Sequence, residues 1–176
     1  MPKRSTPILL PEVVLTVDTR EPEHTSWERF FSLPSVRQKM DTADYGILGV
    51  PDVGIERKTA TDLAQCLSWE RDRFCKELER SRALRFFRVI VECDARSFLQ
   101  GRYGERRSRV NPDAIWESLA SFTARYNTRF LFASDAPTAA RMCQSLLTKW
   151  LRENWNILEA VRKANADHNP SRTAVG

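Results

Sequence analysis

One segment near the middle of the chain restricts the possible folds more than any other. Phe86–Cys93 reads Phe-Phe-Arg-Val-Ile-Val-Glu-Cys and is apolar at almost every position. A strand with one face in water alternates between apolar and polar residues, whereas a strand covered on both faces is apolar nearly throughout. Phe86–Cys93 is therefore predicted to be a central strand of a sheet that has other elements packed against both faces.

Other short runs supply the remaining strands of such a sheet. They are rich in β-branched or aromatic residues and are bounded by turn-forming residues, as strands are. The predicted strands are Val13–Val17, Val36–Thr42, Tyr45–Val50, Val53–Lys58 and Phe130–Ala133. The pair Tyr45–Val50 and Val53–Lys58 is predicted to be a hairpin joined through Pro51-Asp52.

Helical spacing of apolar residues and the presence of capping residues predict helices between these strands. Their ranges are Ser26–Leu33, Thr59 or Thr61 to Cys66, Ser68–Arg82, Asn111–Tyr126 and Asp135–Leu158. Because strand and helix patterns alternate along the chain, the sequence favours an α/β sandwich around a mixed sheet.

The length of the chain indicates one domain. A chain of 176 residues with 41% hydrophobic content can form one well-buried core but is short for two. Residues 12–158 are predicted to form that domain, and residues 1–11 and 159–176 are predicted to be flexible tails. No run approaches the roughly 18 consecutive apolar residues of a membrane span, and no signal-peptide core follows the polar start, so an intracellular location is expected.

The charge of the chain favours a polyanionic partner. The formal net charge is +5 and the pI is about 9.3. Most of the positive residues are arginine, whose planar head group suits forked contacts to phosphate. The four cysteines lie far apart, with no Cys-x-x-Cys pair and only two histidines in the chain. Neither a zinc site nor a disulfide framework is indicated, and the cysteines are predicted to be buried free thiols.

Two acids and a lysine in the predicted hairpin point to phosphodiester hydrolysis. Glu56-Arg57-Lys58 ends one strand, and Asp44 stands near the start of its partner. Hydrolysis needs an activated water and relief of the charge on the phosphate, and a hard divalent cation held by carboxylates supplies both. Asp44 and Glu56 would hold the cation. Lys58 would orient or help to deprotonate the water and would stabilise the pentavalent phosphate. Asp44, Glu56 and Lys58 are called the catalytic set below.

Alternation along the strand separates the roles of three neighbouring residues. Glu56 and Lys58 are predicted to share one face of the sheet, because side chains of a strand alternate with a period of two. Arg57 then points to the other face, toward an internal partner or a second phosphate. Its backbone carbonyl is a further candidate metal ligand.

These residues belong to a longer set that resembles the nuclease domain of the xeroderma pigmentosum group F (XPF) endonuclease family. The family signature is Gly-Asp, a variable gap, Glu-Arg-Lys and then an Asp, preceded by a Val-Asp-x-Arg-Glu strand. The matching segments are Val17-Asp18-Thr19-Arg20-Glu21, Ala43-Asp44-Tyr45 and Val53–Leu63, which contains Glu56-Arg57-Lys58 and Asp62. The resemblance continues through Arg73-Phe74 and Val89–Glu92, and more loosely to Trp155, so it covers most of the chain.

The resemblance implies a fold, a cofactor and roles for individual residues. The fold would be restriction-endonuclease-like, a three-layer α/β/α sandwich with a central mixed sheet. Mg²⁺ or Mn²⁺ would bind at Asp44 and Glu56 with support from Asp18, and Lys58 would be catalytic. The supporting network would consist of Arg20, Glu21, Arg57 and Asp62. Members of the family cleave branched DNA, such as flaps and forks, near single-strand junctions and usually act as dimers.

Two features depart from the family pattern. Ala43 replaces the usual glycine before Asp44, and the gap from Asp44 to Glu56 is longer than expected. Asp52 lies in this extra length and is either a spare ligand or a turn residue. The sequence has neither the Gly-x-Gly turns of the tandem helix-hairpin-helix module found in many relatives nor a Gly-rich phosphate loop, so no nucleotide cofactor is expected.

Several of these residues also have purely structural interpretations. The catalytic set could be a surface salt-bridge cluster, and Asp18 could cap the turn after its strand. Arg20 and Glu21 could pair with each other or with Arg57 as scaffold, or contact the substrate. Asp62 could simply be an acid in the first turn of a helix, where the helix dipole favours negative charge.

Arginines outside the catalytic set are candidate DNA contacts. The segment 100–109 contains two glycines, four arginines and Tyr103, and is either a solvated loop or a loop that grips DNA, with the tyrosine stacked on an unpaired base. The candidate DNA-binding residues are Arg57, Arg73, Arg102, Arg106, Arg107 and Arg109. The apolar stripe from Cys143 to Trp155 is either core or, in part, a dimer interface.

The sequence thus predicts a Mg²⁺- or Mn²⁺-dependent DNA endonuclease that acts on branched DNA in repair or recombination, as a possible homodimer without a membrane partner. The alternative is a non-catalytic DNA-binding or dimerisation module, because the resembling family also contains inactive members that keep the fold. Those members usually lose the acids, which this chain retains. A third possibility is a nuclease for other DNA, such as linear duplex. A short version without helicase or hairpin modules resembles those of bacteria and their phages, so bacterial or phage cytoplasm is expected.

Overall fold

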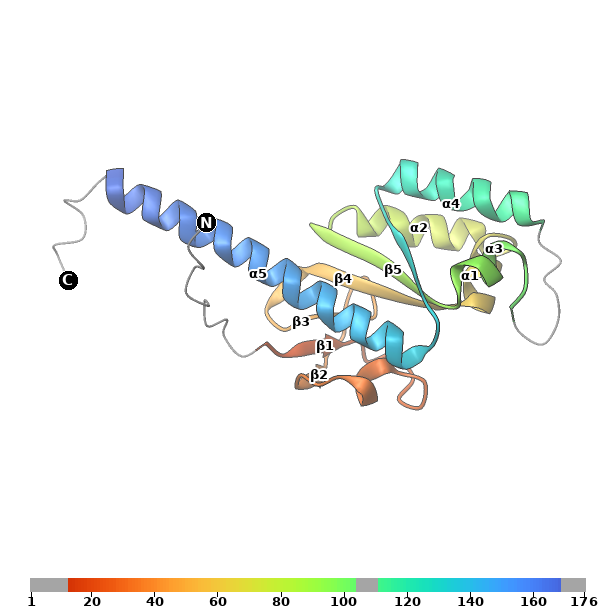
Figure 1. Ribbon diagram of the computed structural model, residues 1–176, viewed down its shortest axis with the longest axis horizontal. Coiled ribbons are helices and arrows are strands. Elements are labelled where there is room, and N and C mark those ends of the chain that lie inside the picture. The colour runs from red at the N-terminus through yellow and green to blue at the C-terminus, as the bar shows by residue number, and fades with distance from the viewer. Residues whose placement is uncertain (1–12, 104–110, 169–176) are drawn as a thin grey trace, which may run out of the picture.

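The chain forms a mixed six-stranded sheet with helices on both faces (Figure 1). The computed structural model describes residues 13–103 and 111–168, with side chains through residue 156. The strands are β1 (Leu15–Val17), β2 (Ser35–Arg37), β3 (Tyr45–Ile47), β4 (Val50–Thr59), β5 (Phe86–Glu92) and β6 (Phe130–Ala133), in the order β2-β1-β3-β4-β5-β6. β3 is antiparallel to both β1 and β4, whereas β2 with β1, and β4 with β5 and β6, run parallel.

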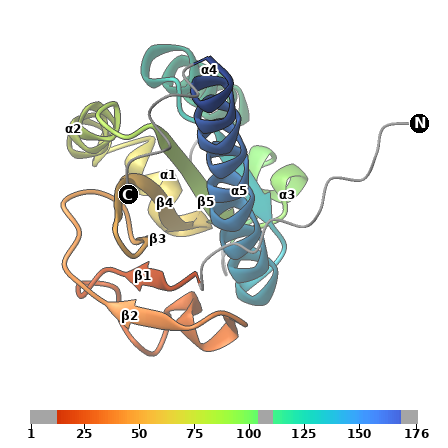
Figure 2. The ribbon, with the colours of Figure 1, turned by 90° about the vertical axis from the view of Figure 1, so that its left-hand side faces the viewer.

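The helices form one layer on each side of this sheet. They are the 3-10 helix η1 (Trp27–Phe30) and the α-helices α1 (Ala60–Cys66), α2 (Arg71–Ser81), α3 (Ala95–Leu99), α4 (Pro112–Tyr126) and α5 (Ala136–His168). α1 to α4 contribute to one hydrophobic core, and η1 and α5 contribute to another. Figure 2 shows α5 on the opposite side of the sheet from α2. We call the two sides the α1 face and the α5 face. The predicted three-layer α/β/α sandwich is confirmed.

β5 has the double coverage that its composition predicts. Val89 and Val91 are fully buried in the core of the α1 face, and Ile90 is fully buried in the core of the α5 face. Their alternation follows from the period of two along a strand. Each apolar residue of β5 therefore packs under a helical layer, and the strand lies between β4 and β6.

The α1 face is not covered by helices along its whole width. Its core draws strand residues from β5 and β6, whereas the segment 38–42 lies over β3. A Cβ atom added at Gly46 of β3 would lie 3.0 Å from the Cε atom of Met40, which shows how closely this segment approaches the strand. Helices thus cover the part of the α1 face over β5 and β6, and the loop 38–42 covers the part over β3.

Two early elements are shorter than predicted. The helix expected at Ser26–Leu33 is only the 3-10 turn η1, which ends because Phe31 has an extended backbone, with φ −71° and ψ 140°. Leu33 is itself disfavoured in a helix because it precedes Pro34. The strand expected at Val36–Thr42 is β2, which ends at Arg37. The backbone N–H of Met40 donates to the carboxylate of Asp18 instead of a neighbouring strand, so the ladder stops.

The hairpin between β3 and β4 turns earlier than predicted. Its tight turn is Leu48-Gly49, with Gly49 at a φ of 80°, a conformation that glycine adopts without strain. Pro51-Asp52 consequently lies within β4, and the turn interpretation of Asp52 is wrong. Asp52 pairs at 3.4 Å with Arg85, the residue just before the neighbouring strand β5.

The last helix is longer than predicted. α5 continues past Leu158 to His168, so the backbone of residues 159–168 is helical rather than an irregular tail. This stretch contains several alanines and charged residues with high helix propensity. Residues 1–11 and 169–176, also predicted to be tails, lie outside the described residues, and the domain limits at 12 and 158 remain predictions.

The cysteines and the helices bear on two further predictions. All four cysteines are free thiols; Cys66 and Cys143 are buried, and Cys75 and Cys93 are partly buried. Across the described ranges, none of the helices has the length and apolar character needed to span a bilayer.

Candidate active site

Alternation along β4 separates Glu56 and Lys58 from Arg57 as predicted. Glu56 and Lys58 lie on the α1 face, and both are buried, at 6% and 8% exposure. The ammonium of Lys58 forms an ion pair with Glu56 and lies 5.4 Å from the ring centre of Phe74, which belongs to the core of that face. The pair therefore is not the exposed salt bridge of the structural alternative.

A third acid, which the sequence reasoning missed, completes this cluster. Glu77 of α2 accepts a hydrogen bond from the Nζ atom of Lys58 at 3.2 Å. Its side chain is only 12% exposed. The available signal was its position between the buried residues Phe74 and Leu78, which places an acid at the edge of the apolar stripe of α2.

The backbone fixes Asp44 beside the Glu-Arg-Lys segment. The Asp44 N–H donates to the carbonyl of Ile55 at 3.0 Å, and the Asp44 carbonyl accepts from the N–H of Asp18 at 2.8 Å. The Asp44 carboxylate accepts from the backbone N–H of Arg57 at 2.8 Å. This carboxylate is thereby aimed at the strand that carries Glu56 and Lys58, and the structure brings the whole catalytic set together.

The unusual Ala43 stands in a conformation that explains the family preference at this position. Its φ is +77°, in the left-handed region that favours glycine. Its methyl group faces Gly54 of β4, where an added Cβ would lie 2.6 Å away. In this chain, the alanine before Asp44 is accommodated because the residue across the hairpin has no side chain.

The electrostatics of the cluster favour a cation. Burial, reinforced by the charges of Glu21 and Glu77, raises the pKa of Asp44 to about 6. Burial and the charge of Asp44 raise the pKa of Glu56 well above its ordinary value. Burial would lower the pKa of Lys58, but the charges of Glu56 and Glu77 outweigh it and raise that pKa. Three acids thus lie around one ammonium ion, and a cation bound among them would favour their ionised forms.

The donor set suits a hard divalent cation that is only partly enclosed by protein. Asp44 and Glu56 offer carboxylate oxygens, the ligands that Mg²⁺ and Mn²⁺ prefer. Among the described residues, no three side chains of His, Cys, Asp or Glu converge in an arrangement that could hold an ion by themselves. Mg²⁺ commonly binds through one or two carboxylates and completes its shell with water and substrate phosphate. The residues fit that mode of binding.

Asp18 has no vacant acceptor position for a metal. Its Oδ1 accepts from the backbone N–H and the Nε of Arg20, both at 2.7 Å. Its Oδ2 accepts from the Nη2 of Arg20 at 3.2 Å and from the N–H of Met40 at 2.6 Å. A carboxylate offers about four such positions. Burial opposes ionisation of Asp18, but these bonds to Arg20 and Met40 outweigh it and lower its pKa. The contacts match the turn-capping alternative.

On the α5 face, Arg57 joins a separate buried network. Its Nε donates to Glu92 at 2.6 Å, and its Nη1 donates to Glu21 at 3.1 Å. Each of these acids has a second donor, the indole of Trp27 for Glu92 and the hydroxyl of Tyr45 for Glu21. The internal-partner prediction for Arg57 is confirmed. Its guanidinium is only 12% exposed and tied to two acids, so its assignment as a DNA contact is corrected.

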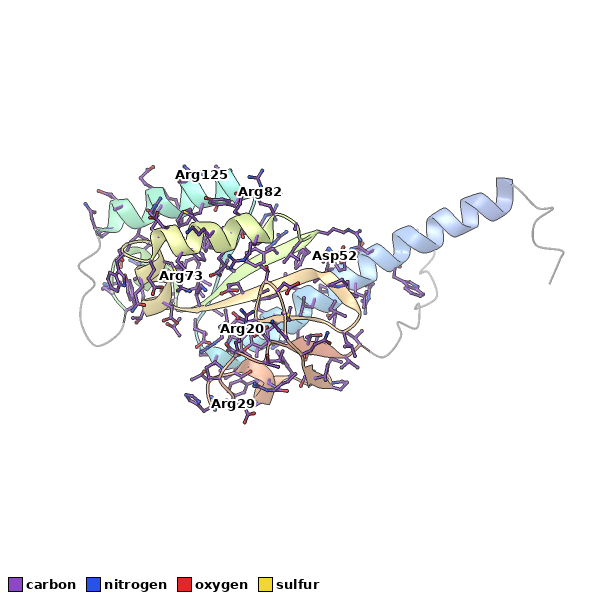
Figure 3. All side chains as sticks on the ribbon, turned by 180° about the vertical axis from the view of Figure 1, so that it is seen from behind. Arg20, Arg29, Asp52, Arg73, Arg82 and Arg125 are labelled. Carbon is purple, nitrogen blue, oxygen red and sulfur yellow. The ribbon has the colours of Figure 1, made fainter. Side chains whose placement is uncertain are left out.

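The remaining supporting residues lie nearer the surface. Asp62 forms a reciprocal capping box with Thr59 at the start of α1, as the helix interpretation states. Arg73 pairs with Glu70, and Arg20 pairs with Asp18, but each arginine keeps 65% of its side chain exposed. Figure 3 shows Arg20 and Arg73 on the α1 face, on opposite sides of β4.

The predicted arginine loop is described only at its beginning. Arg102 is exposed, whereas Tyr103 is partly buried and stacks on Phe98 with 4.8 Å between ring centres. Tyr103 therefore packs against its own domain, in place of the predicted stacking on a base. Arg106, Arg107 and Arg109 lie outside the described residues.

Comparison with known proteins agrees with this fold. Two solved structures of XPF from Aeropyrum pernix share the fold, each with a TM-score of 0.62. The one in complex with DNA is 20% identical over 80% of this chain and 66% of that chain, and the other is 21% identical over 93% and 75%. The architecture is thus that of an α/β nuclease fold. The sequence matches the ERCC4 domain over residues 17–146, and the chain belongs to that family. No curated protein matches it.

Proposed function

We propose that this protein is a Mg²⁺- or Mn²⁺-dependent endonuclease that hydrolyses phosphodiester bonds in branched DNA. The observation that carries the proposal is the buried pair Glu56 and Lys58 on one face of β4, with the Asp44 carboxylate held beside them by the backbone N–H of Arg57. Membership of the ERCC4 domain family supports a nuclease, and the DNA complex of XPF from Aeropyrum pernix supports DNA as the substrate.

Within this proposal each residue of the site has a defined task. Asp44 and Glu56 hold the divalent cation, which, when bound, polarises the phosphate and acidifies a water molecule. Lys58 is protonated, since its pKa is raised, and its ammonium donates hydrogen bonds to the phosphate as negative charge accumulates there. Glu77 positions that ammonium through its 3.2 Å contact. Water would attack phosphorus and release a proton to the surrounding solvent, while the phosphorus–oxygen bond to the leaving nucleotide breaks and the leaving oxygen takes a proton from solvent. The raised pKa of Lys58 keeps it protonated, so its role is charge stabilisation.

The proposal is tested with labelled fork, flap and linear DNA in the presence of Mg²⁺ or Mn²⁺. Wild-type protein should cleave the branched substrates, and Glu56→Gln and Lys58→Met should each reduce the rate about 100-fold or more. Glu79→Gln is the matched control, because Glu79 is an exposed acid of α2 that pairs with Arg82. This variant should cleave at the wild-type rate. Absence of cleavage of all substrates, with Glu56→Gln indistinguishable from wild type, refutes the proposal.

The second candidate is a non-catalytic DNA-binding module. It is favoured by the ion pair between Lys58 and Glu56 and by the lack of a group of three metal-binding side chains among the described residues. Calorimetric titration with Mn²⁺ separates the two candidates. Heat of binding that disappears in Asp44→Asn supports the enzyme, whereas no uptake by wild-type protein together with tight fork binding supports the module.

We also propose that the protein forms a homodimer. The predicted stripe of α5 is core at Cys143 and Leu147, and Trp150 packs at its edge, but the helix then extends beyond the sheet (Figure 1). A helix that continues past its own sheet can pair with a second copy of the chain. Light scattering at high micromolar concentration should give the mass of a dimer, and a strict monomer removes this part of the proposal.

A further inference from the structure

A cavity of about 640 Å³ opens on the α1 face next to the catalytic set but does not include it. Its walls come from the segment 38–42, from the beginning of β4 at Val50–Asp52, and from Arg80 and Leu84 at the end of α2. It occupies the part of the face that a loop, rather than a helix, covers. In Figure 3, Asp52 marks this end of the face and Arg73 the opposite end.

The cavity is joined to the site by short connections. Its wall residue Met40 is held by both partners of the Asp18–Arg20 ion pair, through its N–H to Asp18 at 2.6 Å and its carbonyl to Arg20 at 2.7 Å. Another wall residue, Leu84, would lie 3.2 Å from a Cβ at Gly54. Gly54 is one same-face step before Glu56, roughly 7 Å along the strand. A nucleotide next to a phosphate at Glu56 can therefore reach the cavity.

The lining suits a flat, uncharged group with hydrogen-bonding edges. Apolar atoms come from residues such as Met40, Val50 and Leu84, and polar atoms come from Gln38 and Thr42. The charged residues that line it balance, with two cations and two acids: Lys39, Arg80, Asp41 and Asp52. A phosphate pocket would concentrate cations. The volume lies in the range of pockets for small organic ligands, roughly 300–1,000 Å³.

We infer that this cavity receives one base of an unpaired nucleotide that flanks the scissile phosphate. The inference rests on the proposed function and adds a reason for its preference for DNA with single-strand character. An unpaired base enters the cavity freely, whereas a base in a duplex must first be unpaired and unstacked, which costs free energy. The active site would thus favour junctions because it binds the unpaired nucleotide beside the cleaved bond. This preference would add to any contacts with the duplex.

The test uses a fork that carries 2-aminopurine, a fluorescent base, at successive positions of its unpaired arm. Full-length wild-type protein is added without divalent metal, so that binding is read without cleavage. At one position next to the cleavage site, 2-aminopurine fluorescence should increase and become protected from acrylamide quenching. The increase is expected because the base leaves the stack, and the protection because the cavity encloses it. This reading needs no variant and is independent of folding effects of mutations.

Two tryptophan variants link the signal to the cavity. Ala83 is an exposed wall residue, and Ala83→Trp should fill the cavity, remove the signal and weaken fork binding about tenfold. Ala124→Trp is the matched control at an exposed position of α4 outside the lining and should behave as wild type. Replacing the reporting nucleotide by an abasic site should weaken binding to wild type but not to Ala83→Trp.

The outcomes separate this inference from the proposed function. If wild-type protein cleaves the fork but no position brightens and becomes protected, or if Ala83→Trp keeps the signal, the cavity inference is wrong and the nuclease stands. The inference is also wrong if the cavity binds a terminal phosphate instead of a base. In that case fork binding would depend on a 5′-phosphate and would survive removal of the base. Failure of the nuclease itself shows in the separate comparison of wild type with Glu56→Gln.

Discussion

The two faces of β4 carry ionic clusters that are built from adjacent residues and yet differ in balance. On the α5 face, Arg57 meets two acids, and each acid also receives a neutral donor. On the α1 face, Lys58 meets Glu56 and Glu77, with Asp44 nearby, so three acids accompany one lysine, against two acids and one arginine on the other face. In the first cluster each acid has two hydrogen-bond donors. In the second, acids outnumber the cation by two, so the cluster can accept a further positive charge.

The difference follows the chemistry of the two cations. Arginine presents a planar fork that can hold two carboxylates in fixed positions, whereas lysine is a compact point charge on a flexible stem. Arg57 thus locks the loop that carries Glu21 to the end of β5 at Glu92. Lys58 can change partners as charge moves in the site. The comparison predicts that the α5 face determines stability and that the α1 face determines activity.

The largest expected effect breaks the scaffold. Arg57→Met leaves two buried acids without their cation and should lower the free energy of unfolding by about 3–5 kcal/mol. Lys58→Met should lower it less, because the acids around it already have raised pKa values and can take up protons. Urea unfolding of the two variants gives this comparison directly. Equal losses of stability would mean that the two faces do not differ in the way proposed.

The next effect concerns pH. In metal-free buffer, Asp44 keeps its proton to about pH 6 when folded but only to about 3.8 when unfolded. The folded state binds more protons between these values, so this group makes stability fall as pH rises, by about 3 kcal/mol in total. Asp44→Asn should remove this fall in unfolding measurements from pH 4 to 7. Asp18, whose pKa is lowered, contributes stability above its ordinary pKa, so Asp18→Asn should instead lose stability at neutral pH.

An intermediate effect sharpens the role of the acid from α2. Glu77→Gln keeps a hydrogen-bond acceptor for Lys58 but removes a charge, and it should slow cleavage about tenfold, or about 1.4 kcal/mol, because the ammonium is held less firmly. The KM for fork DNA should change little. A rate equal to that of the exposed control Glu79→Gln would show that Glu77 does not position Lys58.

The smallest effect is a coupling of about 1 kcal/mol between two residues in contact across the hairpin. Gly54→Ala should cost about 1–3 kcal/mol, since its new Cβ would meet the methyl group of Ala43 at 2.6 Å. In the Ala43→Gly background the cost should fall by about 1 kcal/mol, a coupling typical of residues in contact. A double-mutant cycle in urea measures the coupling. Strict additivity would show that this contact does not constrain the hairpin.

The comparison also shows how far the sequence could predict the site. Alternation alone assigned Glu56 and Lys58 to one face and Arg57 to the other. Glu77 could not be placed, because its contact with Lys58 depends on how α2 packs across β4, which no local pattern encodes. Glu92 was accessible in principle, since it ends β5 and pairs with Thr59 in the parallel register of β4 and β5.

Some residues allowed two readings that only tertiary structure could separate. Asp18 carries a motif typical of a ligand, but its loop brings Arg20 and Met40 to all of its acceptor positions. Asp52 was assigned to a turn because Pro51 precedes it, whereas Gly49 takes the positive φ and moves the turn upstream. Tertiary contacts decided the first case, and the backbone conformation of a neighbouring glycine decided the second. A local sequence pattern reports neither.

The continuity of β4 and α1 has a mechanical consequence for the proposed reaction. Thr59 is the last residue of the strand and the cap of the helix, so Lys58 stands between two regular elements with no loop to adjust its position. Turning its backbone would uncap the helix and break the pairing with β5 together. Within the proposed function, the site would therefore be rigid, and the nucleic acid rather than the protein would change shape on binding. The choice of target would then depend on how easily each DNA deforms.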